Sequence, residues 1–147
     1  MADSTSTTAS TEIAAPPLVV LDVIADLAHY PEWADGVRAV DIQDVDEDGR
    51  PLRARFDVAS GVVNGWYVID YVWHDDAVTW SLVESPLLRA MDGSYDVVPT
   101  SDGATVTYSL HLALAMPLIG ALRRKAEQHI VSTALNDLAA RASEVAA

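Results

Sequence analysis

The sequence predicts an α+β protein in which a seven-stranded antiparallel sheet wraps around a long C-terminal helix, with one or two short helices after the first strand. Three observations lead to this prediction. Apolar residues alternate with polar ones from residue 37 to residue 115, and turn residues interrupt them at short intervals. A long helical pattern follows Pro117. A short strand and a short amphipathic helix precede the alternating region.

The N-terminal part is expected to hold a flexible tail, one strand and one short helix. Residues 1–7 are polar and predict the tail, which leaves residues 8–147 as a single domain. A strand is expected over residues 8–14. Pro16 and Pro17 suit the first turn of the helix that follows, because the backbone donors that proline lacks have no partner there anyway.

Six alternating runs, joined by short turns, predict an antiparallel meander. They are VRAVDIQDV (37–45), LRARFDVA (52–59), VNGWYVIDYVWH (63–74), VTWSLVE (78–84), MDGSYDVVP (91–99) and ATVTYSLHLALA (104–115). The turn DVDEDG at 44–49 has the acidic spacing of a calcium loop, but Arg55 stands where the bidentate glutamate belongs. We therefore expect a plain connection between strands there, and no calcium.

The last helix is expected to run without interruption over residues 118–143 and to pack across the concave face of the sheet. A helix of roughly 40 Å, at about 1.5 Å per residue, needs a broad apolar surface to lie on, and a curved sheet offers one. Its apolar stripe is predicted to comprise Ile119, Leu122, Ala126, Ile130, Ala134 and Leu138.

One face of the predicted sheet is apolar and yet rich in tyrosine. Strand alternation places Tyr67, Tyr71, Tyr95 and Tyr108 on this face. Because each buried phenol needs a hydrogen-bond partner, so many tyrosines are typical of a ligand cavity that has polar groups on an apolar wall. The alternative is an ordinary core whose hydroxyls reach the edge of the sheet, and the pattern leaves both open.

The composition excludes several classes of partner. The chain carries 22 acidic and 9 basic residues, a formal net charge of −13, which argues against nucleic acid and anionic membrane surfaces as partners. The adjacent cations Arg123, Arg124 and Lys125 are expected on a solvated helix face. No apolar stretch predicts a signal peptide or a membrane span, so we expect a cytoplasmic protein without integral membrane association. The absence of cysteine excludes disulfides and thiolate metal sites.

Four stretches of the sequence carry a resemblance to a known family. They are STEIAAPP, VIADLAHYPEWADGV, LLRAMDGSYDVVP and ALRRKAEQHIVSTALNDL. Together with the order of the elements, they resemble the helix-grip fold of the START-like superfamily. Within it the chain is most similar to the bacterial polyketide cyclase/dehydrase and lipid-transport family. The resemblance covers nearly the whole chain from residue 9, and it identifies a fold better than a ligand or reaction.

The resemblance implies a hydrophobic cavity between the sheet and the long helix, with the segment HYPEWADGV (29–37) closing one mouth. Trp33 would pack inward, Pro31 would fix the bend and Tyr30 would lie at the rim. The alternative is that Tyr30 and Trp33 form a hydrophobic plug that takes no part in ligand binding. The residues expected to line the cavity are Tyr30, Trp33, Phe56, Tyr67, Tyr71, Trp80, Tyr95, Tyr108, Leu122 and Ile130.

A search of the sequence for catalytic groups assigns none. The histidines at 29, 74, 111 and 129 lack the spacing of metal ligands. No phosphate loop, dinucleotide fingerprint or nucleophile elbow occurs, so no cofactor or metal is expected. The apolar face offers tyrosines as donors but no evident general base. Glu84, Arg89 and Asp92 are expected in solvent.

These observations leave three hypotheses of function. The first is a carrier or sequestering protein that binds a mid-sized hydrophobic molecule such as a lipid, quinone, isoprenoid or polyketide. The second is a polyketide cyclase or dehydratase that acts in the same cavity. The third is an interaction module with a filled core, whose partner protein the sequence does not identify. An inward carboxylate or histidine would favour the enzyme, and a filled interior would favour the interaction module.

Overall fold

The computed structural model describes residues 6–59, 64–116 and 120–147. The strands are β1 (Thr7–Ile13), β2 (Val37–Val45), β3 (Pro51–Ala59), β4 (Asn64–Trp73), β5 (Ala77–Glu84), β6 (Leu88–Pro99) and β7 (Ala104–Leu114). The helical elements are α1 (Pro17–Ala25), the 3-10 helix η2 (Leu27–His29), α2 (Tyr30–Trp33) and α3 (Gly120–Ala146).

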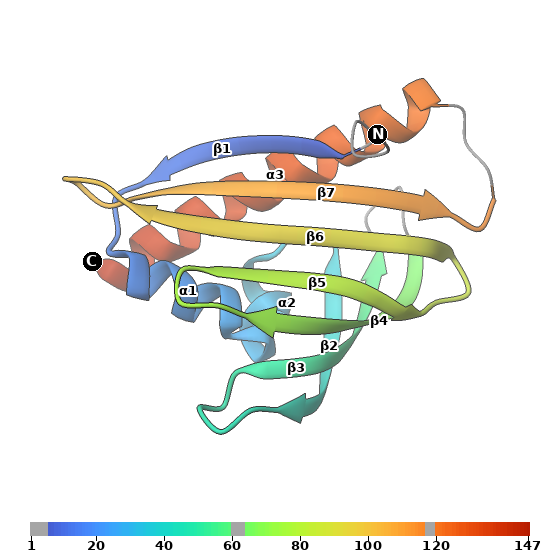
Figure 1. Cartoon of the computed structure of the whole chain (residues 1–147), viewed down its shortest axis with the longest axis horizontal. Helices are drawn as coiled ribbons and strands as arrows, with labels where there is room; N and C mark the ends of the chain where they lie inside the picture. The colour runs from blue at the N-terminus through green and yellow to red at the C-terminus, as the bar shows by residue number, and fades with distance from the viewer. Residues whose placement is uncertain (1–5, 60–63, 117–119) are drawn as a thin grey trace.

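The seven strands form one antiparallel sheet in the order β1-β7-β6-β5-β4-β3-β2. After β1 the chain crosses to the opposite edge of the sheet through α1, η2 and α2, and it then returns strand by strand as a meander (Figure 1). The predicted α+β architecture is therefore confirmed, with short helices after the first strand and the long helix last. Of the predicted tail, residues 1–5 lie outside the described residues, and β1 begins at Thr7.

The start of α1 and the turn between β2 and β3 agree with their sequence signals. Helix α1 begins at Pro17, directly after Pro16 in extended conformation. In the acidic turn, the Asp46 carboxylate accepts hydrogen bonds from the backbone N–H groups of Asp48 and Arg50, both at 2.9 Å. Asp46 of the acidic run therefore stabilises the turn. Gly49 supplies the positive φ of 83° that the turn requires.

The strands begin and end close to their predicted positions, except that β6 begins at Leu88 rather than Met91. The reason is a tight turn built on Ser85. Its Oγ accepts the backbone N–H groups of Leu87 at 3.0 Å and Leu88 at 3.3 Å, and its hydroxyl donates to the carbonyl oxygen of Trp66 at 2.8 Å. The chain can therefore resume a strand at Leu88.

Helix α3 is one uninterrupted element of 27 residues, as predicted, and it runs diagonally behind β1 and β7 in Figure 1. Its predicted apolar stripe needs correction. The most buried side chains are those of Glu127, Val131, Leu135, Leu138 and Ala142. Leu138 is buried as predicted. Before it the buried stripe is shifted by one position, because the helix packs on β1, β7 and α1 while Ile130 and Ala134 lie half-buried beside it. Ile119 lies outside the described residues.

Candidate functional site

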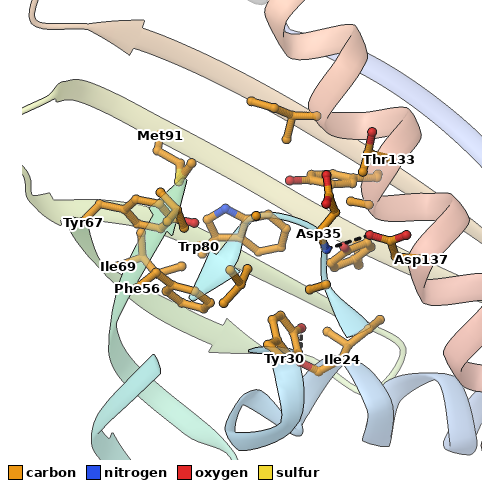
Figure 2. A pocket seen from close by; sticks show the side chains of 18 of the residues that line it. Ile24, Tyr30, Asp35, Phe56, Tyr67, Ile69, Trp80, Met91, Thr133 and Asp137 are labelled. Atoms are coloured by element: carbon orange, nitrogen blue, oxygen red, sulfur yellow. Dashed lines mark hydrogen bonds between the residues drawn. The ribbon is translucent and has the colours of Figure 1, made fainter. Parts of the chain in front are cut away.

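A cavity of about 160 Å³ lies between the concave face of the sheet, α3 and the segment that leads from α2 into β2. In Figure 2 the side away from α3 is apolar, whereas the side next to α3 carries polar groups. The apolar side is formed by Phe56, Tyr67, Ile69 and Met91. The polar side is formed by Asp35, Thr133 and Asp137.

Aromatic rings form a large part of the wall. Those that line the cavity are Tyr30, Trp33, Phe56, Tyr67, Tyr71, Trp80, Tyr95 and Tyr108. They contact one another: the ring of Phe56 stacks on that of Tyr67 at 5.3 Å between centroids, and the Trp80 ring lies 5.4 Å from Tyr95. Such offset and tilted pairs are favourable, so the rings hold one another in position before any ligand arrives.

Most of the tyrosine hydroxyls in the cavity are not used by the fold. The Tyr30 hydroxyl donates to the carbonyl oxygen of Ile24 at 2.6 Å. In the described part of the chain, the other four have no hydrogen-bond partner; they belong to Tyr67, Tyr71, Tyr95 and Tyr108. Burial raises the pKa of each of these four phenols above its ordinary value. They are therefore neutral hydroxyls that can donate to a ligand.

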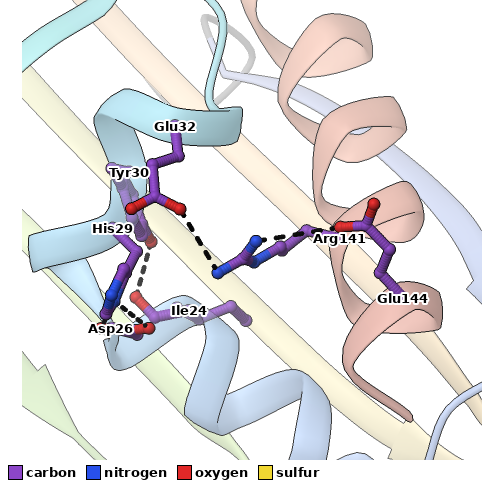
Figure 3. A network of polar contacts seen from close by, with 7 residues as sticks. All are labelled: Ile24, Asp26, His29, Tyr30, Glu32, Arg141 and Glu144. Atoms are coloured by element: carbon purple, nitrogen blue, oxygen red, sulfur yellow. Dashed lines mark hydrogen bonds and ion pairs between the residues drawn. The ribbon is translucent and has the colours of Figure 1, made fainter. Parts of the chain in front are cut away.

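The segment that closes the cavity is tied to α1 and α3 (Figure 3). The ring of Tyr30 packs edge-on against that of Trp33 at 4.8 Å, and its hydroxyl is held by Ile24. Arg141 on α3 lies 4.0 Å from the carboxylate of Glu32. The backbone N–H of Asp35 donates to the carboxylate of Asp137 at 2.9 Å. These contacts hold the segment that closes the cavity in place between the sheet and α3.

The polar side of the cavity was missed by the sequence analysis. Its side chains on α3 are His129, Thr133 and Asp137, and Asp35 faces them from the turn before β2. Their spacing of four residues places the three α3 side chains on one side of the helix, next to Ile130. This spacing is the sequence signal that could have identified the polar side chains of α3. Sequence analysis gave His129 no role in the site and did not consider Asp35, Thr133 or Asp137 as site residues.

The sequence profile of the polyketide cyclase / dehydrase and lipid transport family matches residues 4–143. The chain belongs to this family. The resemblance seen in the sequence is thereby confirmed. No curated protein sequence matches the chain.

Solved structures with the same fold cover nearly the whole chain. A START superfamily protein from Mycobacterium smegmatis has a TM-score of 0.88 at 18% identity, over 95% of this chain and 98% of that protein. The Zhui aromatase/cyclase from Streptomyces sp. R1128 has a TM-score of 0.79 at 14% identity, over 95% and 93%. A STAR-related lipid transfer protein from Xanthomonas axonopodis has a TM-score of 0.69 at 19% identity, over 93% and 85%. At these identities the similarity establishes the fold of this family member.

The structure brings nine of the ten predicted site residues to the cavity of this family member. They are Tyr30, Trp33, Phe56, Tyr67, Tyr71, Trp80, Tyr95, Tyr108 and Ile130. The exception is Leu122, which is 52% exposed and lies outside the lining. The rotated stripe of α3 explains this difference, because Leu122 lies on the solvent side of the stripe centred on Glu127 and Val131.

Glu127 holds a second buried polar cluster, which does not line the cavity. Its carboxylate accepts hydrogen bonds from the Thr7 hydroxyl and the Leu112 backbone N–H, both at 2.7 Å, and from Arg123 at 3.1 Å. His111 Nδ1 lies 3.9 Å from the same carboxylate. The cluster fastens the start of α3 to β1 and β7.

Within the described ranges, no helix has the length and apolarity to cross a membrane.

Proposed function

We propose that this protein binds a small hydrophobic molecule in its cavity, as a carrier or sequestering protein. The observation that carries the proposal is an aromatic wall in which four of the five tyrosine hydroxyls have no partner in the described part of the chain. Burial of an apolar ligand against this wall would supply the affinity, and the hydroxyls would orient the ligand. Membership of the polyketide cyclase / dehydrase and lipid transport family supports a hydrophobic ligand.

The size of the cavity narrows the choice of ligand. A volume of 160 Å³ is close to that of cavities, about 150 Å³, that hold a benzene-sized molecule. The cavity therefore encloses one aromatic ring, and a second ring would extend toward its opening. A long lipid or a folded polyketide chain would require α3 to separate from the segment before β2. That movement breaks two contacts, from Asp35 to Asp137 and from Glu32 to Arg141.

The polar side of the cavity favours one further candidate, a cyclase or dehydratase. His129 and Asp137 line the cavity and could each take a proton from a carbon beside a ligand carbonyl. A buried phenol such as Tyr108 would donate a hydrogen bond to the oxygen on which the negative charge develops. A binding protein needs neither step, so turnover separates the two candidates.

Binding is tested with 2-naphthalenemethanol, a neutral two-ring probe, by isothermal titration calorimetry. We expect saturable binding with one site per chain. Ile130→Glu places a charge in the cavity and should weaken binding at least tenfold, because the carboxylate would lose water when an apolar ligand packs against it. Leu122→Glu makes the same change on the exposed side of α3 and should leave binding unchanged.

The outcomes separate the alternatives. An absence of binding by the parent protein, or equal loss in both variants, would contradict a ligand cavity. Extraction of protein purified from its native host, followed by mass spectrometry, would identify the bound molecule. Cyclisation of a polyketide-like substrate by the parent protein, lost in Asp137→Asn or His129→Gln while binding persists, would establish the enzyme instead of the carrier.

A further inference from the structure

The charges around the cavity are uneven. Asp35 and Asp137 lie together on the side next to α3 (Figure 2). Among the described residues that line the cavity there is no lysine and no arginine. The nearest cation on α3, Arg141, follows Asp137 by one turn, and it already contacts Glu32 at 4.0 Å and Glu144 at 3.8 Å. The mouth of the cavity, which is its polar side next to α3, therefore carries surplus negative charge.

We propose that the ligand of this cavity is an aryl-alkyl amine, whose ring lies among the aromatic side chains and whose ammonium group lies beside Asp35 and Asp137. This inference rests on the proposed function and adds the charge of the ligand to it. The two ends of such a molecule match the two sides of the cavity, because one is apolar and the other is anionic.

The carboxylates are free to receive a cation. Asp137 accepts the backbone N–H of Asp35 through Oδ2, and within the described residues neither carboxylate forms an ion pair. An ammonium group placed between them would gain attraction from both. A carboxylate in the same place would be repelled by both, and the lining offers it no arginine or lysine.

The aromatic wall adds a second, independent reason. Tyr71 and Tyr108 are only 8% and 6% exposed, line the cavity, and have no hydrogen-bond partner for their hydroxyls among the described residues. A phenol oxygen accepts a hydrogen bond from an ammonium group, and the faces of the surrounding rings attract a cation. The ring faces favour a positively charged nitrogen over a negatively charged oxygen, whereas the hydroxyls can pair with either.

The experiment compares three naphthalenes that share one ring system: 2-naphthylmethylamine, 2-naphthalenemethanol and 2-naphthoate. Titration calorimetry at pH 8 measures the affinity of each compound. We expect the amine to bind about tenfold more tightly than the alcohol, and the carboxylate at least tenfold more weakly. The preference for the amine should shrink in 1 M NaCl, because the mouth is open to solvent.

Two conservative variants test whether Asp35 and Asp137 cause the preference for the amine. Asp137→Asn keeps an oxygen that can accept the Asp35 N–H, and Asp35→Asn keeps that N–H itself. Each should reduce the preference for the amine over the alcohol about threefold, and the double variant should remove it. Asp102→Asn, in the exposed turn between β6 and β7, removes one charge outside the cavity and should preserve the preference.

Three results would overturn the inference. An amine that binds no more tightly than the alcohol, or a carboxylate that binds as well as the amine, would show that the ligand charge is not selected. A preference that survives the double variant would place the selection elsewhere. If none of the three probes binds, the proposed function fails and this inference fails with it. If the alcohol binds and the amine gains nothing, only this inference fails.

Discussion

The indole of Trp80 lies against Gly93, its partner on the neighbouring strand β6. A Cβ built at Gly93 would overlap ring atoms Cε2, Cζ2 and Nε1 of Trp80. The missing side chain therefore creates the space in which the Trp80 ring rests. From this position Trp80 contacts the rings of Tyr71, Tyr95 and Tyr108. One glycine thus supports much of the aromatic wall.

Gly93→Ala should disturb the cavity as well as the fold. The new methyl group meets a rigid ring rather than a flexible side chain, so Trp80 must move. We expect a loss of about 1–3 kcal/mol in the free energy of unfolding, as for an overpacked core. Binding of 2-naphthalenemethanol should weaken at least tenfold. Urea unfolding measures the first effect and titration calorimetry the second.

Gly49→Ala is the control for this change. Gly49 has a φ of 83° and no atom of another residue within 4 Å of a built Cβ. Alanine there should cost about 1–2 kcal/mol of backbone strain and leave binding intact. Parent-like binding by Gly93→Ala would show that Trp80 does not shape the ligand site.

The tyrosine hydroxyls should separate into structural and ligand-directed groups. Tyr30→Phe removes the hydrogen bond to Ile24 and should lower the free energy of unfolding by about 0.5–1.5 kcal/mol. Tyr71→Phe removes a hydroxyl that has no partner in the described part of the chain, so stability should change by less than about 0.5 kcal/mol. Thermal unfolding and titration with 2-naphthalenemethanol compare the two variants. Similar stability losses in both would contradict the division.

Glu127 is expected to be the most sensitive polar position of the described core. Glu127→Ala leaves the Thr7 hydroxyl and the Leu112 N–H without their shared acceptor at a fully buried position, which should cost about 1–3 kcal/mol. Glu127→Gln retains an acceptor oxygen and should cost less. Gln128→Ala, on the exposed side of the same helix, should stay within about 0.5 kcal/mol of the parent. Urea unfolding that ranks these variants differently would exclude the cluster as a fastening point.

Much of the cavity could be predicted from the strands, because a strand has only two faces. Once the apolar face of β4 is known, Tyr67, Ile69 and Tyr71 must share it, and the structure agrees. A helix has no such simple rule. On α3, Ile130 faces the cavity, Val131 faces the core and Leu122 faces solvent, although all three are apolar. A shift of one residue along the helix therefore changes whether a side chain faces the cavity, the core or solvent.

The polar side of the cavity depends on contacts between distant parts of the chain. Asp35 lies in a turn without periodicity, and its partner Asp137 follows 102 residues later. No local pattern could pair them. The buried position of Glu127 is similar, because its carboxylate is satisfied by the Thr7 hydroxyl on β1 and a backbone group of β7, which come together only in the folded sheet.

The cavity should make the protein sensitive to alkali. All five tyrosines of the chain line the cavity, and burial, as the largest cause, raises the pKa of each above its ordinary value near 10. Below about pH 10 the phenols are protonated in both the folded and the unfolded state, so their ionisation takes nothing from the free energy of unfolding. Above it the unfolded chain loses protons that the folded chain keeps, and stability falls as the pH rises toward the folded pKa. Tyr71 and Tyr108, the most buried of the five, should each cost about 1.4 kcal/mol per pH unit in this range.

Absorbance at 295 nm and circular dichroism at 222 nm, followed together from pH 9 to pH 12.5, check this prediction. We expect phenolate formation and loss of structure in one shared transition, well above the pH at which N-acetyltyrosinamide ionises under the same conditions. The double variant Tyr71→Phe, Tyr108→Phe should unfold over a broader pH range, because fewer protons are released on unfolding. Saturation with 2-naphthalenemethanol should move the transition of the parent protein to higher pH, since the ligand binds only the folded state. Phenolate absorbance that rises near pH 10 while the dichroism stays unchanged would mean that the hydroxyls face open solvent, contrary to the enclosed aromatic wall.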